Sequence, residues 1–300
     1  MPRLRTLLIV IAVLAAAALG AWAVLRATPA GQARHLLAQS RQLIARGDAT
    51  AADAALRTLL QQFPHADAAG DAWFALAQIA EQREDWLAAQ QAYQRILQEF
   101  PMSDRVVPAQ DALGNANMRL LLSPVVTAQD HLYVVQPGDT LAAIAKRFHV
   151  TVEWLRRANQ LSGDMIHPAM RLKIPGGTFG VLVDKSHNTL MVKRGEDIIK
   201  QYAVATGSDN STPAGAFTIM NRLVNPPWYT PTGVIPAGDP RNVLGTRWLG
   251  FDKPGYGIHG TTDPSTMGQQ VTAGCVRMRN ADVEELFIII PEGAVVTIIN

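Results

Sequence analysis

Two short glycine-rich segments near the C-terminus carry the side chains best suited to chemistry. One presents His259 within residues 255–261 (GYGIHGT), and the other presents Cys275 within residues 272–278 (TAGCVRM). Glycines let the backbone approach a substrate closely and leave a side chain exposed in a tight turn. A thiol beside an imidazole suits acyl transfer, because the imidazole takes the proton of a thiol whose pKa is ordinarily about 8.5. We therefore predict a Cys275 nucleophile and a His259 base.

The backbone around this cysteine suggests a second element of acyl-transfer chemistry. The amides of Gly274 and Cys275 are candidate donors to the oxyanion that forms at the attacked carbonyl. The alternative interpretation of a lone cysteine is an inert buried side chain. Cys275 is the only cysteine of the 300 residues, so no intrachain disulfide can use it.

Composition excludes several classes of protein. Apolar residues make up 48% and charged residues 17%, which is a globular composition. The net charge is +2, and no region carries the basic stripe that phosphate neutralisation demands, so we expect no nucleic-acid partner. No metal-ligand spacing or phosphate-binding loop is present, so we expect no cofactor.

Residues 1–27 predict export from the cytoplasm. An uncharged apolar run covers residues 6–25, between Arg5 and Arg26. Such a run, at about 1.5 Å per residue, reaches roughly 30 Å and would span a bilayer with its N-terminus in the cytoplasm. A cleaved signal peptide is the alternative, because residues 21–23 (AWA) form an acceptable cleavage site. Both interpretations export the remainder of the chain across that membrane.

Residues 31–123 predict an all-α helical-repeat region. Residues 59–67 (LLQQFPHAD) recur as residues 96–104 (ILQEFPMSD), an offset of 37. A period of this length with a closing proline is typical of stacked helical hairpins. The second copy resembles a tetratricopeptide repeat, and residues 106–122 would supply a third hairpin. A plain helical spacer or dimerisation bundle is the alternative, and a protein partner of the repeats cannot be read from the sequence.

Residues 131–176 predict a small β-α-α-β module after a linker at 125–130. A short strand leads into a Pro-Gly-Asp turn, a residue of that turn caps a helix, and a closing strand ends at residues 172–175 (LKIP). The segments at 131–141 (HLYVVQPGDTL) and 172–175 make it resemble a LysM module. That resemblance implies binding of peptidoglycan glycan strands in a groove containing Gly138, Asp139, Thr140 and Pro168. Gly138 and Asp139 are turn and cap residues in any case.

Residues 177–300 predict a mainly antiparallel β domain, with strands near 179–183, 189–193, 199–206 and 294–299. Five ordered segments make this region resemble the catalytic domain of the YkuD-like L,D-transpeptidases. They are residues 204–207 (VATG), 212–217 (TPAGAF), 245–249 (GTRWL), 258–261 (IHGT) and 274–278 (GCVRM).

This second resemblance assigns roles to individual residues. It implies Cys275 as nucleophile, His259 as base and the Gly260 carbonyl as the group that orients the imidazole. Many family members have histidine where this chain has Ala273, so a second role for that histidine is absent. The implied substrate-binding residues are Arg277, Thr272, Ala273, Tyr256 and Trp248.

The resemblance also implies a reaction. The Cys275 thiolate attacks the diaminopimelate carbonyl of a peptidoglycan stem tetrapeptide, releases D-Ala and forms a thioester, which an amine of a second stem then accepts. With other acceptors the protein would be a carboxypeptidase, a cross-link hydrolase or an enzyme that anchors proteins to the wall. A non-catalytic peptidoglycan-binding scaffold is the alternative of another class.

Overall fold

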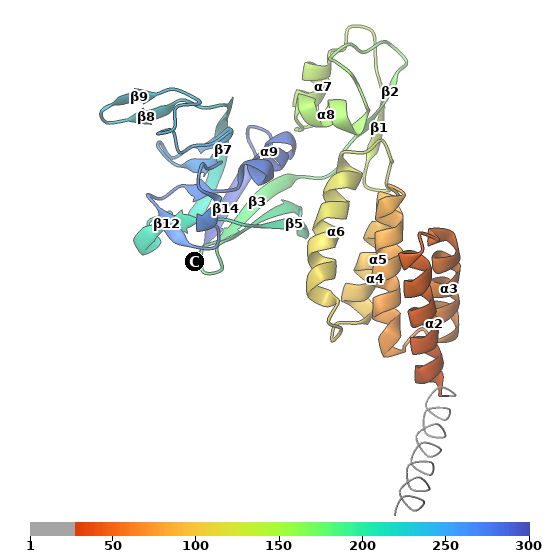
Figure 1. The fold of residues 1–300 in the computed structure, drawn as a ribbon. Helices are drawn as coiled ribbons and strands as arrows, with labels where there is room; N and C mark the ends of the chain where they lie inside the picture. The colour runs from red at the N-terminus through yellow and green to blue at the C-terminus, as the bar shows by residue number, and fades with distance from the viewer. Residues whose placement is uncertain (1–27) are drawn as a thin grey trace, which may run out of the picture. The chain divides into compact units, whose positions relative to one another are not determined.

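The computed structural model describes residues 28–300, which divide into two compact units at residues 116 and 117 (Figure 1). No helix in this described part of the chain has the length and apolar character that a bilayer crossing requires. The membrane span or signal peptide predicted at residues 1–27 lies outside the described residues. Each unit is therefore considered by itself.

The first unit consists of helical hairpins whose ends repeat as the sequence predicts. Its helices are α2 (Pro29–Ala45), α3 (Ala49–Gln62), α4 (Asp67–Gln82) and α5 (Trp86–Glu99), followed by the start of α6 (Val106–Leu121). The Asp48 side chain caps α3 by accepting from the Ala51 amide, and Asp85, 37 residues later, caps α5 in the same way from Ala88. This helical architecture is compatible with tetratricopeptide-like repeats, whose identity stays a prediction.

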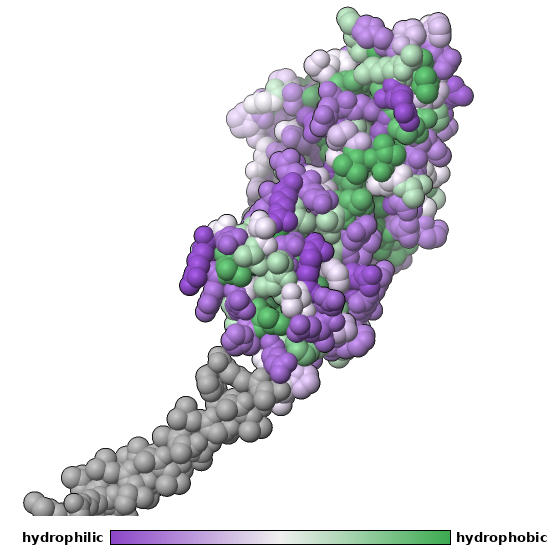
Figure 2. Space-filling model, turned by 90° about the vertical axis from the view of Figure 1, so that its right-hand side faces the viewer, coloured by the Kyte–Doolittle hydropathy of each residue, from purple (hydrophilic) through white to green (hydrophobic). Residues whose placement is uncertain are grey.

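The expected third hairpin is wrong, because α6 is a single helix. Pro108 lies in the first turn of α6, where its missing amide costs no hydrogen bond, and Gly114 alone does not end a helix. On the face drawn in Figure 2 hydrophilic side chains predominate, with hydrophobic residues gathered in patches. The helices of the first unit thus bury one face and expose a polar one.

The second unit begins with the predicted β-α-α-β module. Strands β1 (His131–Val134) and β2 (Arg171–Ile174) pair antiparallel, and α7 (Leu141–Arg147) and α8 (Val152–Ala158) lie between them in the chain. The end of α6 is fastened to this module by Lys173, whose ammonium donates to the carbonyls of Leu120, Ser123 and Val125 at 3.0, 3.0 and 2.6 Å. The segment that we predicted to be a linker is therefore held against the module.

The rest of the second unit is built on an eight-stranded sheet in the order β13-β11-β10-β7-β14-β3-β4-β5. Its strands are β3 (Phe179–Asp184), β4 (Thr189–Arg194), β5 (Asp197–Ala203), β7 (Gly215–Val224), β10 (Arg247–Phe251), β11 (Gly257–His259), β13 (Val276–Arg277) and β14 (Val295–Ile299). The smaller elements are the pairs β6 (Thr206–Gly207) with β12 (Gln270–Thr272) and β8 (Trp228–Thr230) with β9 (Gly233–Ile235), the 3-10 helices η1 (Ser208–Asn210) and η2 (Pro264–Thr266), and the helix α9 (Asn280–Ile289).

The sheet is mainly antiparallel but mixed. Strand β14 runs parallel to β3, and β11 runs parallel to β13. The helix α9, which the sequence analysis did not predict, enters the chain between β13 and β14. It connects β13, at one edge of the sheet, with β14, which lies between β7 and β3, and so returns the chain to the centre of the sheet.

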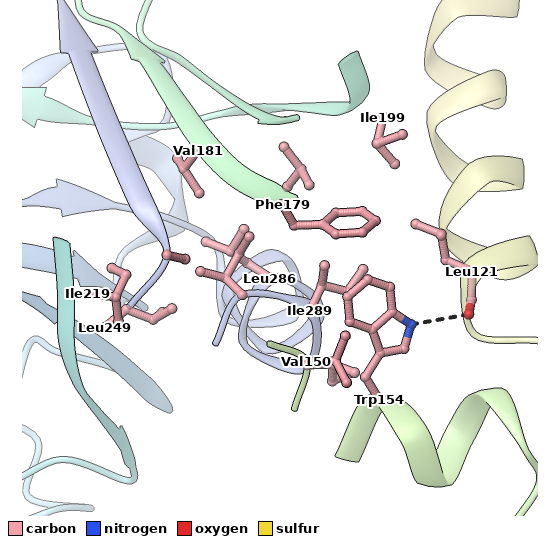
Figure 3. Close-up of a cluster of buried hydrophobic side chains, with 14 of the residues drawn as sticks. Leu121, Val150, Trp154, Phe179, Val181, Ile199, Ile219, Leu249, Leu286 and Ile289 are labelled. Carbon is pink, nitrogen blue, oxygen red and sulfur yellow. Dashed lines mark hydrogen bonds between the residues drawn. The ribbon is translucent and has the colours of Figure 1, made fainter. Parts of the chain in front are cut away.

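The β-α-α-β module and the sheet domain share one hydrophobic core (Figure 3). Trp154 of α8 is 0% exposed, and its ring meets Phe179 of β3 edge to face at a centroid distance of 4.7 Å. Its indole nitrogen donates to the Leu121 carbonyl at 3.2 Å, and the Thr151 hydroxyl donates to the Ile288 carbonyl of α9. Only residues 175–178 separate β2 from β3, so the module is packed onto the sheet domain.

Candidate active site

Cys275 and His259 lie on neighbouring strands at one edge of the large sheet. The parallel pairing of β11 with β13 aligns Ile258 with Val276 and His259 with Arg277, and Cys275 directly precedes β13. The structure thus brings together three predicted site residues that are up to 18 positions apart in the sequence. Its geometry excludes a separation of Cys275 from His259 by the body of the domain.

The imidazole of His259 is held in one orientation. Its Nδ1 lies 2.7 Å from the Gly260 carbonyl oxygen, and its ring stacks on Trp248 at 6.0 Å. A carbonyl can only accept, so Nδ1 carries the proton and Nε2 keeps its lone pair. The pKa of His259 is lowered to about 4, chiefly by burial; the bond to Gly260 acts in the opposite direction, and the charge of Arg277 contributes to the lowering. His259 is therefore neutral and able to accept a proton at neutral pH.

A partly buried amide side chain shapes the backbone beneath His259. Asn280, the first residue of α9, accepts from the amides of Thr246 and Thr261 at 3.3 and 3.0 Å. A Cβ on Gly260 would lie 2.2 Å from the Asn280 Oδ1, so only glycine fits at position 260. Sequence reasoning missed Asn280, because nothing local marks it and its contacts lie 19 and 34 residues away.

The turn that carries Cys275 is closed by Thr272. The Thr272 hydroxyl donates to the Cys275 carbonyl at 2.6 Å and accepts from the Gly274 amide at 3.2 Å. Gly274 has φ of +126°, which a side chain would strain, and a Cβ there would lie 2.8 Å from the Tyr256 ring. Thr272 is thus buried and used within the protein, where the sequence predicted a contact with substrate.

The thiol of Cys275 opens into a cavity of about 550 Å³. Its Sγ lies 3.4 Å from the Gly255 carbonyl oxygen. Burial raises the pKa of Cys275 above its ordinary value, and a backbone hydrogen bond from Gly257 and the charge of Arg277 act in the opposite direction. The cavity is lined by Asn221, Leu223, Pro226, Pro227, Trp228, Tyr229, Leu244, Trp248, Gly255 and Cys275.

The other predicted substrate-binding residues differ in whether they line this cavity. Trp248 lines it and donates to Asn221 Oδ1 at 3.0 Å, whereas Tyr256 packs against Gly274. Arg277 donates through Nη1 to the Thr266 hydroxyl at 3.3 Å, while its buried Nε has no hydrogen-bond partner among residues 28–300. Ala273 is exposed beside Cys275. The hairpin of β8 and β9 supplies Trp228 and Tyr229, which the sequence analysis did not single out.

The predicted glycan-binding residues lie in the β-α-α-β module. Gly138 has φ of +89° in the turn, Asp139 accepts from the Tyr133 hydroxyl and the Gln136 amide at 2.7 Å each, and Thr140 caps α7. Pro168 is exposed in the loop before β2. Three of the four residues thus have structural roles, so sugar binding by them stays a prediction.

The protonation states of the pair predict a distinctive pH dependence. We expect the rate of Cys275 alkylation by iodoacetamide, followed by mass spectrometry, to rise about tenfold per pH unit between pH 6 and 8, because the resting pair is a thiol and a neutral imidazole. A plateau over this range would contradict the assignment, since a stable thiolate–imidazolium pair reacts at a constant rate. Free cysteine in the same buffers is the control.

Comparison with known proteins identifies the families of both regions, the LysM-like module and the L,D-transpeptidase-like domain. Residues 178–298 match the family model of the L,D-transpeptidase catalytic domain, named YkuD, and residues 133–175 match that of the LysM domain. The putative L,D-transpeptidase YkuD of Bacillus licheniformis is 37% identical over 175 residues, which cover 56% of this chain and 98% of the relative. The chain belongs to the YkuD L,D-transpeptidase family.

A second relative is similar to the same extent, and solved L,D-transpeptidase structures match more weakly. The putative L,D-transpeptidase YkuD of Bacillus subtilis is 35% identical over 173 residues, covering 55% of this chain and 97% of the relative. Among solved structures, an L,D-transpeptidase from Mycobacterium smegmatis matches with 16% identity and a TM-score of 0.37, covering 44% of this chain and 64% of that chain. The LysM module and the L,D-transpeptidase catalytic domain predicted from the sequence are confirmed.

Proposed function

We propose that the protein cross-links peptidoglycan through a Cys275 thioester. The observation that carries this proposal is the placement of Cys275 in the wall of a cavity, beside a strand whose His259 is neutral and fixed by Gly260. Membership of the L,D-transpeptidase family supports a peptidoglycan stem peptide as the substrate. The LysM module supports binding of its glycan strands.

In the first half of the proposed reaction, His259 Nε2 accepts the thiol proton as Cys275 Sγ attacks the diaminopimelate carbonyl of a stem tetrapeptide. The Cys275 amide donates to the oxyanion, because the Gly274 amide is already bonded to Thr272. When the tetrahedral intermediate collapses, the imidazolium returns its proton to the leaving D-Ala amine. The products are free D-Ala and a Cys275 thioester.

In the second half, an amine of another stem attacks the thioester carbonyl and passes a proton to His259. Collapse forms the new amide bond and expels the Cys275 sulfur, which regains its proton from the imidazolium. Trp228 and Tyr229 of the β8–β9 hairpin line the cavity with apolar surface, which limits water near the thioester. This apolar side of the cavity favours attack on the thioester by an amine over attack by water.

The proposed location follows from the substrate. Peptidoglycan lies outside the cytoplasmic membrane, and we propose that residues 1–27 deliver the chain there, as an uncleaved anchor or as a signal peptide. Residues 31–123 would then lie between that segment and the LysM module, available to a protein partner. Domain boundaries at 131–176 and 177–300 belong to the same proposal.

The test is product analysis with the full chain and purified disaccharide-tetrapeptide. Mass spectrometry is expected to show dimers that have lost one D-Ala for each bond formed, with no added metal or nucleotide. Tripeptides without dimers would replace cross-linking by hydrolysis, and incorporation of an added protein lysine would replace it by anchoring. Unchanged substrate with intact, folded protein would indicate a non-catalytic scaffold.

A further inference from the structure

Lys185 is a buried cation in the catalytic domain that the proposed reaction does not use. It follows β3, is 3% exposed, and donates through Nζ to the Thr212 carbonyl at 2.8 Å. Across residues 28–300, no carboxylate forms an ion pair with this ammonium. Because a buried charge without an opposite charge destabilises a fold, a neutral side chain would serve packing better at this position.

The acceptor of Lys185 closes a tight loop. Thr212 is itself buried, and its hydroxyl accepts from the Gly207 amide at 2.7 Å, so residues 207–212 are fastened at both ends. Within the loop Asp209 and Asn210 have φ of +50° and +60°. Asp and Asn adopt this left-handed conformation more readily than other residues with side chains, but two in succession still need surrounding contacts to hold them. Lys185 and Thr212 supply such contacts.

This loop packs directly on the turn that carries Cys275. A Cβ on Gly207 would lie 3.1 Å from the Gly274 Cα, and the Ser211 carbonyl oxygen lies 3.3 Å from an equivalent Cβ on Gly274. The Ser208 hydroxyl donates to the Thr272 carbonyl at 3.4 Å, and β6 pairs with β12 so that Gly207 faces Thr272. The backbone of the loop therefore forms the back wall of the Cys275 turn.

The main chain of Lys185 meets the same region. Its carbonyl accepts from the Gln270 side chain of β12 at 3.2 Å, and its amide donates to the Ile299 carbonyl of β14 at 3.1 Å. Lys185 thus joins the centre of the large sheet to both segments that flank the Cys275 turn. Its side chain reaches one of them and its carbonyl the other.

We propose that Lys185 is a positioning residue that acts through Thr212 and the loop 207–212 to hold the Gly274–Cys275 turn in its reactive geometry. The role rests on the proposed function of Cys275 as the nucleophile. Lys185 acts through this backbone wall, because its ammonium donates to the Thr212 carbonyl and the adjoining Ser211 carbonyl lies against Gly274. The ammonium is retained because it fixes the Thr212 carbonyl, at the expense of fold stability.

The test compares Lys185→Met with Lys193→Met, which removes a partly exposed lysine of the same sheet that pairs with Glu196. In Lys185→Met we expect the maximal rate of Cys275 acylation by a β-lactam to fall on the order of 10- to 100-fold with the half-saturating concentration unchanged. The thermal midpoint should stay the same or rise, since a buried charge is removed. Lys193→Met should leave both quantities unchanged.

A second measurement does not depend on acylation at all. Hydrogen exchange of the Gly207 amide, which Thr212 protects, should quicken at least tenfold in Lys185→Met and not in Lys193→Met. Faster exchange in Lys185→Met, together with a wild-type protein that no β-lactam acylates, would sink the proposed function and leave the loop contact standing. Parallel losses of thermal midpoint and acylation would make Lys185 merely structural. A shifted pH profile of Cys275 alkylation would mean that Lys185 acts on the thiol by its charge. Either result would overturn the proposal.

Discussion

Replacing Cys275 with alanine is expected to abolish both D-Ala release and dimer formation. The expected loss is roughly 10⁴- to 10⁶-fold, the scale found when the nucleophile of another acyl-transfer enzyme is removed. The cause is direct, because the cavity then presents a methyl group where the sulfur stood and no thioester forms. The measurement is the rate of product formation by mass spectrometry, together with the intact mass of the protein after exposure to a β-lactam.

Cys275 is the single cysteine of the chain, which makes the control unusually clean. Cys275→Ser keeps the size and hydrogen bonding of the side chain, but its hydroxyl is far less ionised than a thiol, so it should be nearly as inactive as alanine. Both variants should unfold at the temperature of the parent. A β-lactam adduct on Cys275→Ala would place the nucleophile elsewhere in the chain and contradict the assignment.

The chemical centre of the site could be predicted from the sequence because its residues are locally marked. Cys275 and His259 each lie among glycines, and those glycines have identifiable steric reasons: Gly274 needs a left-handed φ and Gly260 faces Asn280. What surrounds the pair could not be predicted. Asn280 and Lys185 act through contacts 19 to 114 residues away along the chain, and no local pattern encodes such contacts.

The same distinction applies to the fold. The 37-residue repeat predicted the helical hairpins because it is a local feature, and the structure adds matching caps at Asp48 and Asp85, 37 residues apart. Helix α9 was missed because the apolar run that ends it, residues 286–290 (LFIII), is equally typical of a buried strand. The parallel pairs, β14 with β3 and β11 with β13, join strands that are not consecutive in the chain, and no local pattern encodes such pairing.

Sequence patterns also mark the LysM module and the catalytic domain as separate segments, whereas the structure gives them one core. As a separate segment, the LysM module would serve to raise the local concentration of peptidoglycan near the active site. Deleting residues 125–175 would then be expected to weaken binding to peptidoglycan more than turnover of small peptides. That deletion would also remove Val150, Trp154 and the other module side chains that cover Phe179 and Ile289 (Figure 3). It would therefore damage the catalytic domain itself, and a point substitution in the shared core is the sharper test.

Replacing Trp154 with alanine is expected to destabilise the LysM module and the catalytic domain together, by about 3–5 kcal/mol. The substitution opens a cavity against Phe179 and leaves the Leu121 carbonyl without its indole donor. For a unit of this size the midpoint of thermal unfolding should fall by roughly 6–20 °C. Calorimetry of the full chain measures it, and loss of Cys275 acylation by a β-lactam on heating reports on the catalytic domain.

The matched control is Trp228→Ala, which truncates the same side chain where it is only partly buried in the β8–β9 hairpin. Its effect on the free energy of unfolding should be roughly 1 kcal/mol or less, because little packed surface is lost. The decisive comparison is between the two reporters in Trp154→Ala. Suppose that Trp154→Ala lost acylation only at the temperature at which the parent loses it, while a separate, smaller calorimetric transition moved to lower temperature. The module and the catalytic domain would then unfold independently. If acylation is lost in the same single unfolding transition, the LysM module forms part of the enzyme's hydrophobic core. Its orientation relative to the domain that holds Cys275 is then fixed.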